Sequence, residues 1–362
     1  MARTKKIFVI AGEASGDQHA AAFIEKIRAK NANVEVLAVG GDALEKAGAK
    51  IFLKYNVFAV MGFWEVLKNA KRFKLLINKI AAEILSFEPD MLLLVDSSGL
   101  NMRIAKKIKA KTNIPVHYYI VPKIWAWGEW RIKKIKKYID YLYCILPFEQ
   151  AYFRSKGFEK AYYVGNPTLH AIENFEFESI KELMNIEKPL LALLPGSRKQ
   201  EIVKMLPTML SAGKKLDNTQ MVLACSPGID PAFYQTFIEN YDVKLVFDNT
   251  WNLLKMASMA WVTSGTATLE TALIGCPQVV CYKTSGISYQ MGKRLIKVKY
   301  ISLVNLILEK LAVAELIQNE MNEKILIVET KQLDKAKAQI IQQDLKEKLS
   351  TDKLEDVSML FS

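Results

Sequence analysis

Short apolar runs alternate with longer stretches rich in Lys, Ala, Leu and Ile along the first half of the chain. This alternation is typical of βαβ units, in which parallel strands build one sheet and helices cover its faces. The expected strands are Ile7 to Ala11, Val34 to Val39, Met91 to Val95, Val116 to Val121, Tyr141 to Leu146 and Tyr162 to Val164. The pattern predicts a doubly wound parallel sheet.

The same alternation returns in the second half, after an acidic stretch from Phe175 to Pro189 that reads as a linker region. The expected strands there are Leu190 to Leu194, Met221 to Ala224, Lys244 to Phe247, Met259 to Thr263 and Gln278 to Tyr282. Beyond Ile325 the pattern changes to a polar helix with an apolar stripe at Ile340, Ile341 and Leu345. The second half therefore predicts another doubly wound sheet, followed by a helix.

A length of 362 residues favours two domains over one. We expect an α/β protein with two Rossmann-like domains facing a cleft, the first over residues 1–172 and the second over 189–330. Residues 331–362 are expected to form a helical segment that packs on the first domain or on a partner subunit.

Charge and cysteine content limit the partners and the cellular compartment that we expect for the chain. Lys and Arg number 50 against 38 Asp and Glu, a formal charge of +12, which favours a phosphorylated substrate, an anionic membrane or nucleic acid as partner. Four unpaired-looking cysteines, Cys144, Cys225, Cys276 and Cys281, read as reduced and mostly buried. With no signal-peptide core and no apolar run of about 18 residues, we expect a cytoplasmic protein that at most lies on a membrane surface.

Three loops follow expected strands, where open α/β sheets hold phosphorylated ligands. The first is Gly12 to Asp17, whose two glycines allow a tight turn before a helix expected from Gln18. It matches neither the dinucleotide pattern Gly-x-Gly-x-x-Gly nor the phosphate-loop pattern, which disfavours NAD enzymes and ATPases. The alternative is a plain helix start with Asp17 as its cap.

The second loop, Leu193 to Arg198, and the third, Ser264 to Glu270, favour a nucleotide diphosphate. Arg198 can donate two parallel hydrogen bonds to a diphosphate, although a surface ion pair is the alternative. In the third loop, hydroxyl groups and free helix N–H groups converge on an anion-sized spot, and Glu270 can accept hydrogen bonds from ribose hydroxyls. The alternative there is an ordinary capped helix with a surface Glu.

Asp96 ends a very apolar run, so it delivers a carboxylate to the carboxyl edge of the first sheet. Asp96 could act as the general base that accepts a proton from a sugar hydroxyl, or it could cap the next helix. The chain has no Asp-x-Asp pair and no His/Cys cluster, so we expect neither a metal nor a cofactor. An arginine and a helix start would then neutralise a departing diphosphate. His19 receives no catalytic role.

Aromatic and basic residues mix between Val57 and Ile80, as in helices that lie at anionic lipid headgroups. The expected membrane surface comprises Phe63, Trp64, Leu67, Lys71, Arg72, Leu75 and Leu76. A core helix with a solvated basic face is the alternative. A second basic stretch runs from Trp130 to Lys137.

These motifs, in this order, resemble the lipid-A-disaccharide synthase family. The resemblance rests on GEASGD from Gly12, AVMG from Ala59, WAW from Trp125, LPFE from Leu146, LPGSR, SGTATLE and KYISL from Lys299. It implies a GT-B fold and transfer of diacylglucosamine from UDP to 2,3-diacylglucosamine 1-phosphate, giving a β-1,6-linked disaccharide 1-phosphate and UDP with inversion. It also implies peripheral association with the inner membrane and, in some members, a homodimer formed by exchanged C-terminal segments.

Carried over residue by residue, the resemblance implies that Asp96 and Arg198 are catalytic and that Asn305 helps to hold UDP. The UDP-sugar side would comprise Gly196, Ser197, Arg198, Ser264, Gly265, Thr266, Ala267, Glu270 and Asn305. The acceptor side would comprise Glu13, Ser15, Gly16, Asp17, Met61, Asn101 and Trp125. The chain departs from the family pattern at Val121-Pro122, Asn166 and Val304, where the family usually has Ser-Pro, His and Pro.

Two other hypotheses remain open. Another GT-B enzyme acting on a UDP-sugar, such as the N-acetylglucosamine transferase of peptidoglycan precursors or an epimerase, would share the UDP half of the site but not the acceptor motifs. A basic protein that binds anionic lipid or nucleic acid without chemistry would leave Asp96, Arg198 and Glu270 unexplained. We therefore expect UDP-diacylglucosamine and its acceptor as partners, and no nucleic acid.

Overall fold

The chain folds into two compact units, which lie within Met1–Gly165 (unit 1) and Asn166–Ser350 (unit 2). The computed structural model describes residues 3–31, 33–59, 70–180, 187–286, 289 and 298–350. Unit 2 begins at Asn166, so the acidic stretch expected as a linker already belongs to it: the backbone N–H of Glu178 donates to Asn252 Oδ1 at 2.9 Å, and Ile180 is buried.

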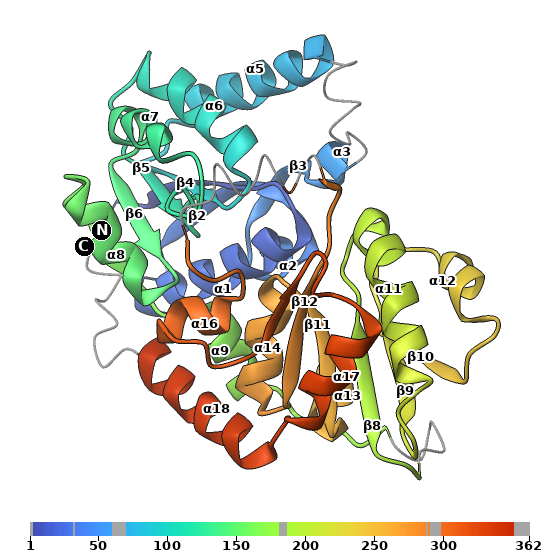
Figure 1. Ribbon diagram of the computed structural model, residues 1–362. Helices are drawn as coiled ribbons and strands as arrows, with labels where there is room; N and C mark the ends of the chain where they lie inside the picture. Colours follow the sequence, from blue (N-terminus) through green and yellow to red (C-terminus); the bar gives the residue numbers. More distant parts are fainter. Residues whose placement is uncertain are drawn as a thin grey trace. The chain divides into compact units, whose positions relative to one another are not determined.

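Unit 1 contains a parallel sheet of seven strands in the order β3-β2-β1-β4-β5-β6-β7 (Figure 1). The strands are β1 (Lys5–Ala11), β2 (Val34–Gly40), β3 (Lys50–Lys54), β4 (Met91–Val95), β5 (Val116–Tyr119), β6 (Tyr141–Cys144) and β7 (Ala161–Tyr163). Every described pairing between them is parallel. The predicted doubly wound sheet is confirmed, and β4 lies at its centre.

Alternate residues of β1 enter two separate cores because successive strand side chains point to opposite faces. Phe8 and Ile10 pack with helices α5 and α6, whereas Ile7, Val9 and Ala11 pack with α1. The helices of unit 1 are α1 (Ala14–Lys30), α2 (Asp42–Lys46), α3 (Asn56–Ala59), α5 (Ala70–Phe87), α6 (Ser98–Lys109), α7 (Ile132–Tyr138) and α8 (Pro147–Ser155), with a 3-10 turn η1 (Glu129–Arg131). Helices therefore cover both faces of the sheet.

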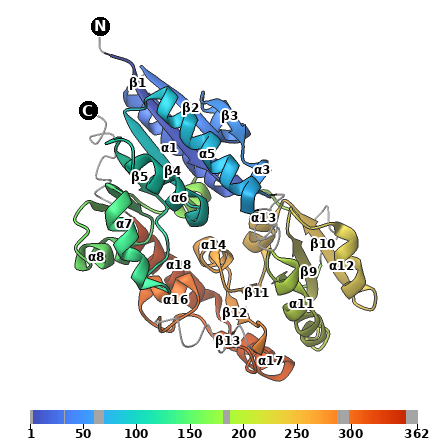
Figure 2. The same cartoon turned by 90° about the horizontal axis from the view of Figure 1, so that it is seen from above.

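Unit 2 contains a second parallel sheet, of six strands in the order β10-β9-β8-β11-β12-β13 (Figure 2). The strands are β8 (Leu190–Leu194), β9 (Gln220–Cys225), β10 (Val243–Phe247), β11 (Met259–Thr263), β12 (Gln278–Tyr282) and β13 (Glu315–Ile317). Its helices are α9 (Pro167–Glu173), α11 (Lys199–Gly213), α12 (Pro231–Ile238), α13 (Thr250–Met256), α14 (Thr266–Ile274), α16 (Leu303–Leu308), α17 (Glu323–Lys331) and α18 (Lys335–Leu349). The predicted α/β class thus holds for both halves.

The expected C-terminal helix is α18, and it belongs to unit 2. It contacts α14 and α16, and it buries Ala338, Ile341 and Leu345 on its inner side. Ile340, which we placed in the apolar stripe, is 61% exposed instead, because it lies on the outer side of the helix. Packing of the segment on the first domain or on a partner subunit stays a prediction.

All four cysteines are buried, as expected, and each lies in or next to a strand or helix of a core. Burial raises the pKa of Cys225 and Cys276 to about 12, and it raises the pKa of Cys144 and Cys281 as well. Cys144 belongs to unit 1, and the other three belong to unit 2.

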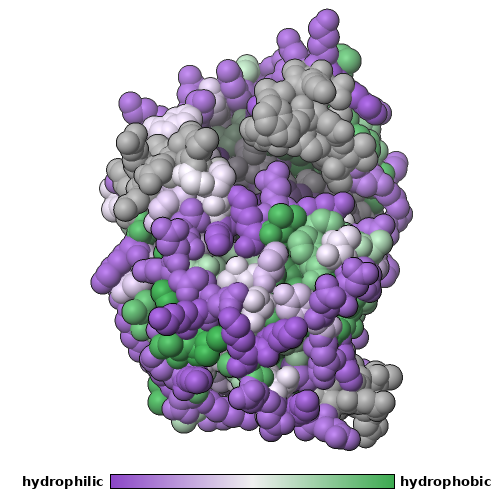
Figure 3. All heavy atoms as spheres, turned by 45° about the vertical axis from the view of Figure 1, so that its right-hand side comes forward, coloured by the Kyte–Doolittle hydropathy of each residue, from purple (hydrophilic) through white to green (hydrophobic). Residues whose placement is uncertain are grey.

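No helix among the described residues is both long and apolar enough to cross a bilayer. The face drawn in Figure 3 is mostly hydrophilic, with small hydrophobic areas between polar side chains.

Candidate active site

Asp96, the predicted base, directly follows the buried central strand β4. Asp96 is exposed, and both it and Ser97 adopt left-handed backbone conformations, with φ of 47° and 37°. Such conformations cost about 1–2 kcal/mol per residue, although Asp tolerates them better than most residues. Strained residues of this kind persist only where neighbours hold them, and they cluster at functional sites. The structure therefore presents the carboxylate on a strained turn at the carboxyl edge of the sheet.

The first glycine loop lies against this turn. A Cβ added at Gly12 would lie 2.7 Å from Ser97 Oγ, and one at Gly16 would contact Ala11 and Val95. Glu13 and Ser15 are exposed at the same edge. Asp96 also acts on His19 of α1: burial lowers the pKa of His19, and the Asp96 carboxylate raises it. The loop, Asp96 and His19 thus form one polar region at the ends of β1 and β4.

Asp17 does not face this region. Its carboxylate accepts hydrogen bonds from the backbone N–H groups of Gly41 and Ala43, at 2.6 and 3.0 Å, and it is 3% exposed. The helix begins at Ala14, three residues before Asp17, so Asp17 does not cap its own helix either. Its role in the structure is to hold the start of α2, where it approaches Gly40 and Gly41 closely.

Trp125, expected on the acceptor side, is anchored by the carboxylate of Glu149, which the sequence showed as part of the LPFE motif but without a role. Its Nε1–H donates to Glu149 Oε1 at 2.9 Å, and its ring packs edge-to-face against Phe148. The other carboxylate oxygen of Glu149 accepts from the backbone N–H groups of Ile145 and Leu146. Arg131 in turn donates to Ser98 Oγ at 3.0 Å. These bonds hold the segment from Trp125 to Arg131 beside the Asp96 turn.

Because Glu149 is buried, we expect its carboxyl to make the free energy of unfolding depend on pH. Burial raises its pKa from 4.5 to about 6, despite the hydrogen bonds that oppose this. The folded state then binds more protons than the unfolded state between these values, so this contribution is fully present below pH 4.5 and is lost as pH rises through 6. The difference corresponds to about 2 kcal/mol.

We expect the gap in unfolding free energy between wild type and Glu149→Gln to widen by about 2 kcal/mol from pH 7 to pH 4.5. Urea unfolding of both proteins across this range measures it. The exposed Glu25→Gln is the control for loss of one carboxylate. A gap that stays constant with pH would contradict the assignment.

In unit 2, the loops after β8 and β11 lie at the same edge because these strands are parallel neighbours, with Leu194 opposite Val262. In the first loop, Gly196 has a φ of 121° and lies against Glu201. Glu201 accepts from the backbone N–H of Ser197 at 3.2 Å and pairs with Arg198 at 3.3 Å. The Arg198 side chain is 81% exposed. The surface ion pair considered for Arg198 is therefore present, and its exposure leaves the guanidinium accessible to a ligand.

The second loop leaves open space at the start of α14. Gly265 and Thr266 are exposed, and a Cβ at Gly265 would meet nothing within 4 Å. Ser264 Oγ instead donates to the carbonyl of Ile301 at 2.8 Å, so this hydroxyl is already engaged. Glu270 accepts from Trp251 Nε1 at 2.8 Å, and burial raises its pKa. Ser197, Arg198, Gly265 and Thr266 are the exposed members of the predicted UDP-binding set.

Asn305 has no free hydrogen-bonding capacity. Its amide donates to the Val313 carbonyl and to Glu315 Oε1, both at 2.9 Å, and its carbonyl accepts from the N–H groups of Ala312 and Val313. Asn305 is 0% exposed. Glu315, which sequence reasoning missed, also accepts from the backbone of Ile301 and Ser302. This described geometry supports a structural role for Asn305, in place of the expected contact with UDP.

Two departures from the family pattern have a structural explanation. Asn166 caps α9, because its Oδ1 accepts from the N–H groups of Thr168 and Leu169. Val304 is buried in the first turn of α16, a position that also accepts proline. Neither residue lies in the loops described above.

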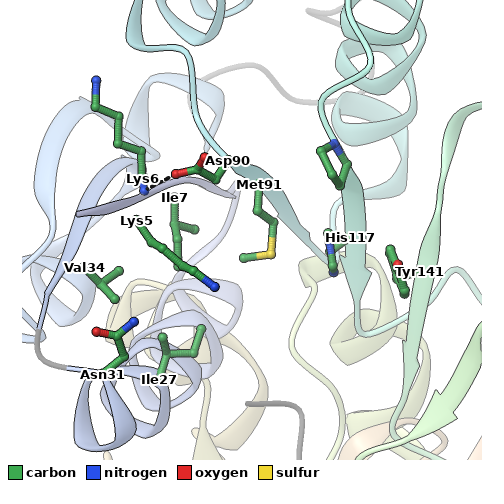
Figure 4. A pocket seen from close by; sticks show the side chains of 11 residues that line it. Lys5, Lys6, Ile7, Ile27, Asn31, Val34, Asp90, Met91, His117 and Tyr141 are labelled. Atoms are coloured by element: carbon green, nitrogen blue, oxygen red, sulfur yellow. Dashed lines mark hydrogen bonds between the residues drawn. The ribbon is translucent and has the colours of Figure 1, made fainter. Parts of the chain in front are cut away.

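A cavity of about 290 Å³ in unit 1 lies at the opposite edge of the sheet, where β1, β4, β5 and β6 begin (Figure 4). Lys5, Met91, His117 and Tyr141 line it. His117 stacks on Tyr141 and bonds the Tyr143 hydroxyl, and burial lowers its pKa to about 3, so it is neutral. Because this cavity lies at the amino ends of the strands, it is separate from the predicted site.

Some predicted residues lie outside the described part of the chain: Met61 on the acceptor side, and Phe63, Trp64 and Leu67 of the membrane surface. Among the described residues, no group of three or more His, Cys, Asp and Glu is placed to hold a metal ion.

A family model described as lipid-A-disaccharide synthetase matches residues 7–360. The chain is 36% identical to the lipid-A-disaccharide synthase of Myxococcus xanthus, over 92% of this chain and 89% of that protein. It is 33% identical to the enzyme of the same name from Francisella philomiragia, over 94% and 93% of the two chains.

Solved structures share the fold. UDP-GlcNAc 2-epimerase from Neisseria meningitidis bound to UDP-GlcNAc is similar at a TM-score of 0.64 and 14% identity, over 98% of each chain. The calicheamicin glycosyltransferase CalG4 is similar at a TM-score of 0.61 and 13% identity, over 99% of this chain and 98% of that one. These likenesses show a GT-B-like fold.

Proposed function

Since the chain belongs to the lipid-A-disaccharide synthetase family, a family of glycosyltransferases in lipid A biosynthesis, we propose that it joins UDP-2,3-diacylglucosamine to 2,3-diacylglucosamine 1-phosphate. The products are the β-1,6-linked disaccharide 1-phosphate and UDP. The observation that carries this proposal is the exposed Asp96 on a strained turn at the carboxyl edge of unit 1, within a family match that includes Arg198.

In the proposed reaction, Asp96 takes the proton from the acceptor's 6-hydroxyl as that oxygen attacks the anomeric carbon. A new carbon–oxygen bond forms, the bond from the anomeric carbon to the UDP oxygen breaks, and the configuration inverts. Arg198 and the N–H groups at Gly265 and Thr266 stabilise the charge on departing UDP. The chemistry requires no metal in this scheme, because a guanidinium and a helix start supply the positive charge.

The proposal is tested by incubating the purified protein with UDP-2,3-diacylglucosamine and the monosaccharide phosphate. We expect mass spectrometry to detect the tetraacyl disaccharide phosphate and UDP, with and without EDTA, and NMR to show a β-linkage. Reactions lacking the acceptor are the control. Consumption of UDP-GlcNAc without an acceptor would instead favour the epimerase hypothesis.

The proposed membrane surface rests on α5 in unit 1. Lys71 and Arg72 are exposed, and Leu75 is 67% exposed, whereas Leu76 packs against the core and does not belong to the surface. Trp127 and Trp130, exposed by 53% and 66%, add two indoles near the basic helix α7. Exposed aromatic and basic groups suit anionic headgroups. We propose peripheral binding to the inner membrane from the cytoplasmic side, and a homodimer formed through the C-terminal segment.

The membrane proposal predicts that replacing Lys71, Arg72 and Lys74 with Ala weakens binding to vesicles containing anionic lipid. Each basic side chain near such a surface contributes about 1 kcal/mol, so we expect a loss of about 100-fold for the triple variant. Sedimentation with vesicles measures it. The control removes Lys335, Lys337 and Lys348, three exposed lysines of α18. Equal losses in both variants would contradict a specific surface on α5.

A further inference from the structure

The turn that carries Asp96 is held by side chains that do not touch its carboxylate. Asn101, from the first turns of α6, donates one N–H to the carbonyl of Val95 at 3.0 Å and one to the carbonyl of Asp96 at 2.8 Å. Tyr118, from the neighbouring strand β5, donates its hydroxyl to the same Asp96 carbonyl. The backbone N–H of Asp96 donates to Tyr119. The Asp96 peptide is thus bonded on both sides.

These donors have a fixed geometry. Asn101 and Tyr118 are both 0% exposed, so water cannot replace their bonds. Rotating the Asn101 amide would bring its oxygen against two carbonyl oxygens, so the observed orientation is the only favourable one. Burial also raises the pKa of Tyr118, which keeps its hydroxyl a donor.

The held conformation is one that the backbone avoids without support. Asp96 and Ser97 have successive positive φ values, and the left-handed region disfavours Ser in particular. If the Asp96 carbonyl rotated toward an extended conformation, it would leave two buried donor hydrogens, one of Asn101 and one of Tyr118, without an acceptor. The two side chains therefore oppose relaxation of the turn.

We propose that Asn101 and Tyr118 are positioning residues that keep the Asp96 turn left-handed and so aim its carboxylate at the acceptor hydroxyl. This inference rests on the proposed function, in which Asp96 is the base. In this inference, Asn101 binds the backbone of the turn, whereas the family resemblance implied that it lies on the acceptor side. The inference also includes Tyr118, which lies in an expected strand and carried no signal of its own.

Tyr118→Phe tests the proposal because it removes one hydroxyl and keeps the ring. We expect kcat to fall by about 10- to 100-fold, since small displacements of a reacting group have effects of this size. The KM for UDP-diacylglucosamine and the Kd for UDP are expected to stay within about twofold, because neither residue belongs to the UDP side. Tyr143→Phe is the matched control: Tyr143 is buried in β6, bonds His117, and does not touch the turn.

Rescue separates positioning from a general loss of packing. Glycine adopts positive φ without strain, so Ser97→Gly in the Tyr118→Phe background is expected to recover most of kcat. Asn101→Ala, alone and combined with Ser97→Gly, gives a second pair with the same expectation should Tyr118→Phe fold poorly.

The outcomes distinguish this inference from the function on which it rests. A kcat for both Tyr118→Phe and Asn101→Ala within twofold of wild type, with Asp96→Asn inactive, would overturn the inference and leave the function standing. An equal fall in kcat for Tyr143→Phe would also overturn it. Wild-type turnover by Asp96→Asn would overturn the inference together with the role of Asp96 as base, whereas absence of the disaccharide product with the wild-type protein would overturn the function itself.

Discussion

Replacing Asp96 with Asn is expected to lower turnover by about 10²- to 10⁴-fold, the range typical of a lost general base. The amide cannot take the proton of the acceptor hydroxyl, so attack on the anomeric carbon would release that proton without assistance. Asn tolerates left-handed backbone as well as Asp does, so the strained turn is expected to persist. Initial rates with both substrates measure the loss.

Binding measurements complete this test. UDP affinity should stay within about twofold of wild type, because Asp96 lies in unit 1 and the predicted UDP loops lie in unit 2. Asp42→Asn removes an exposed carboxylate from α2 of the same unit and is expected to keep wild-type turnover. Turnover by Asp96→Asn within twofold of wild type would show that another group takes the proton.

Replacing Arg198 with Ala is expected to lower kcat/KM by about 10²- to 10³-fold, because one donor to the developing charge is lost. A charged hydrogen bond to the diphosphate also forms in the ground state, so the Kd for UDP should rise by about 10- to 100-fold. Folding stability should change little, because the pair with Glu201 is exposed. Calorimetric titration with UDP and initial-rate measurements check both effects.

Two further variants sharpen this prediction. Arg198→Lys keeps the charge but not the two parallel N–H groups, so an intermediate loss is expected. Lys214→Ala removes one positive charge at the far end of the same helix and is expected to behave as wild type. If Arg198→Ala binds UDP as tightly as wild type, Arg198 acts only in its surface pair with Glu201.

Much of the fold could be predicted because buried parallel strands are nearly continuous apolar runs. Met91–Val95, Leu190–Leu194 and Met259–Thr263 have the predicted bounds. The strand predicted from Val116 to Val121 ends at Tyr119, because Ile120 takes a positive φ of 60° that hydropathy does not reveal. The edge strands β3 and β13 were missed, since both are only partly buried and form only short apolar runs, although the edge strands β7 and β10 were predicted.

The candidate site was less predictable at its buried polar residues. The sequence placed Asp96 directly after β4 and Arg198 in the loop after β8, because strand ends can be located from apolar runs. Asp17 and Asn305 find their partners at Gly41 to Ala43 and at Ala312 to Glu315, and no local pattern encodes these contacts. Tyr118 bonds Asp96 and Glu149 bonds Trp125, each more than 20 positions away along the chain, and neither the apolar strand around Tyr118 nor the LPFE motif reveals these partners.

Each of the two units contains at least one buried cysteine, so the rate at which its thiol is labelled reports how often that unit opens. A protonated, buried thiol does not react with a maleimide or a disulfide reagent, so labelling of the native protein proceeds only through transient exposure of the strand or helix that carries it. Adduct formation at Cys144 would time the opening of unit 1, and adducts at Cys225, Cys276 and Cys281 would time that of unit 2. Peptide mapping after labelling with and without UDP would then show which sheet the nucleotide protects.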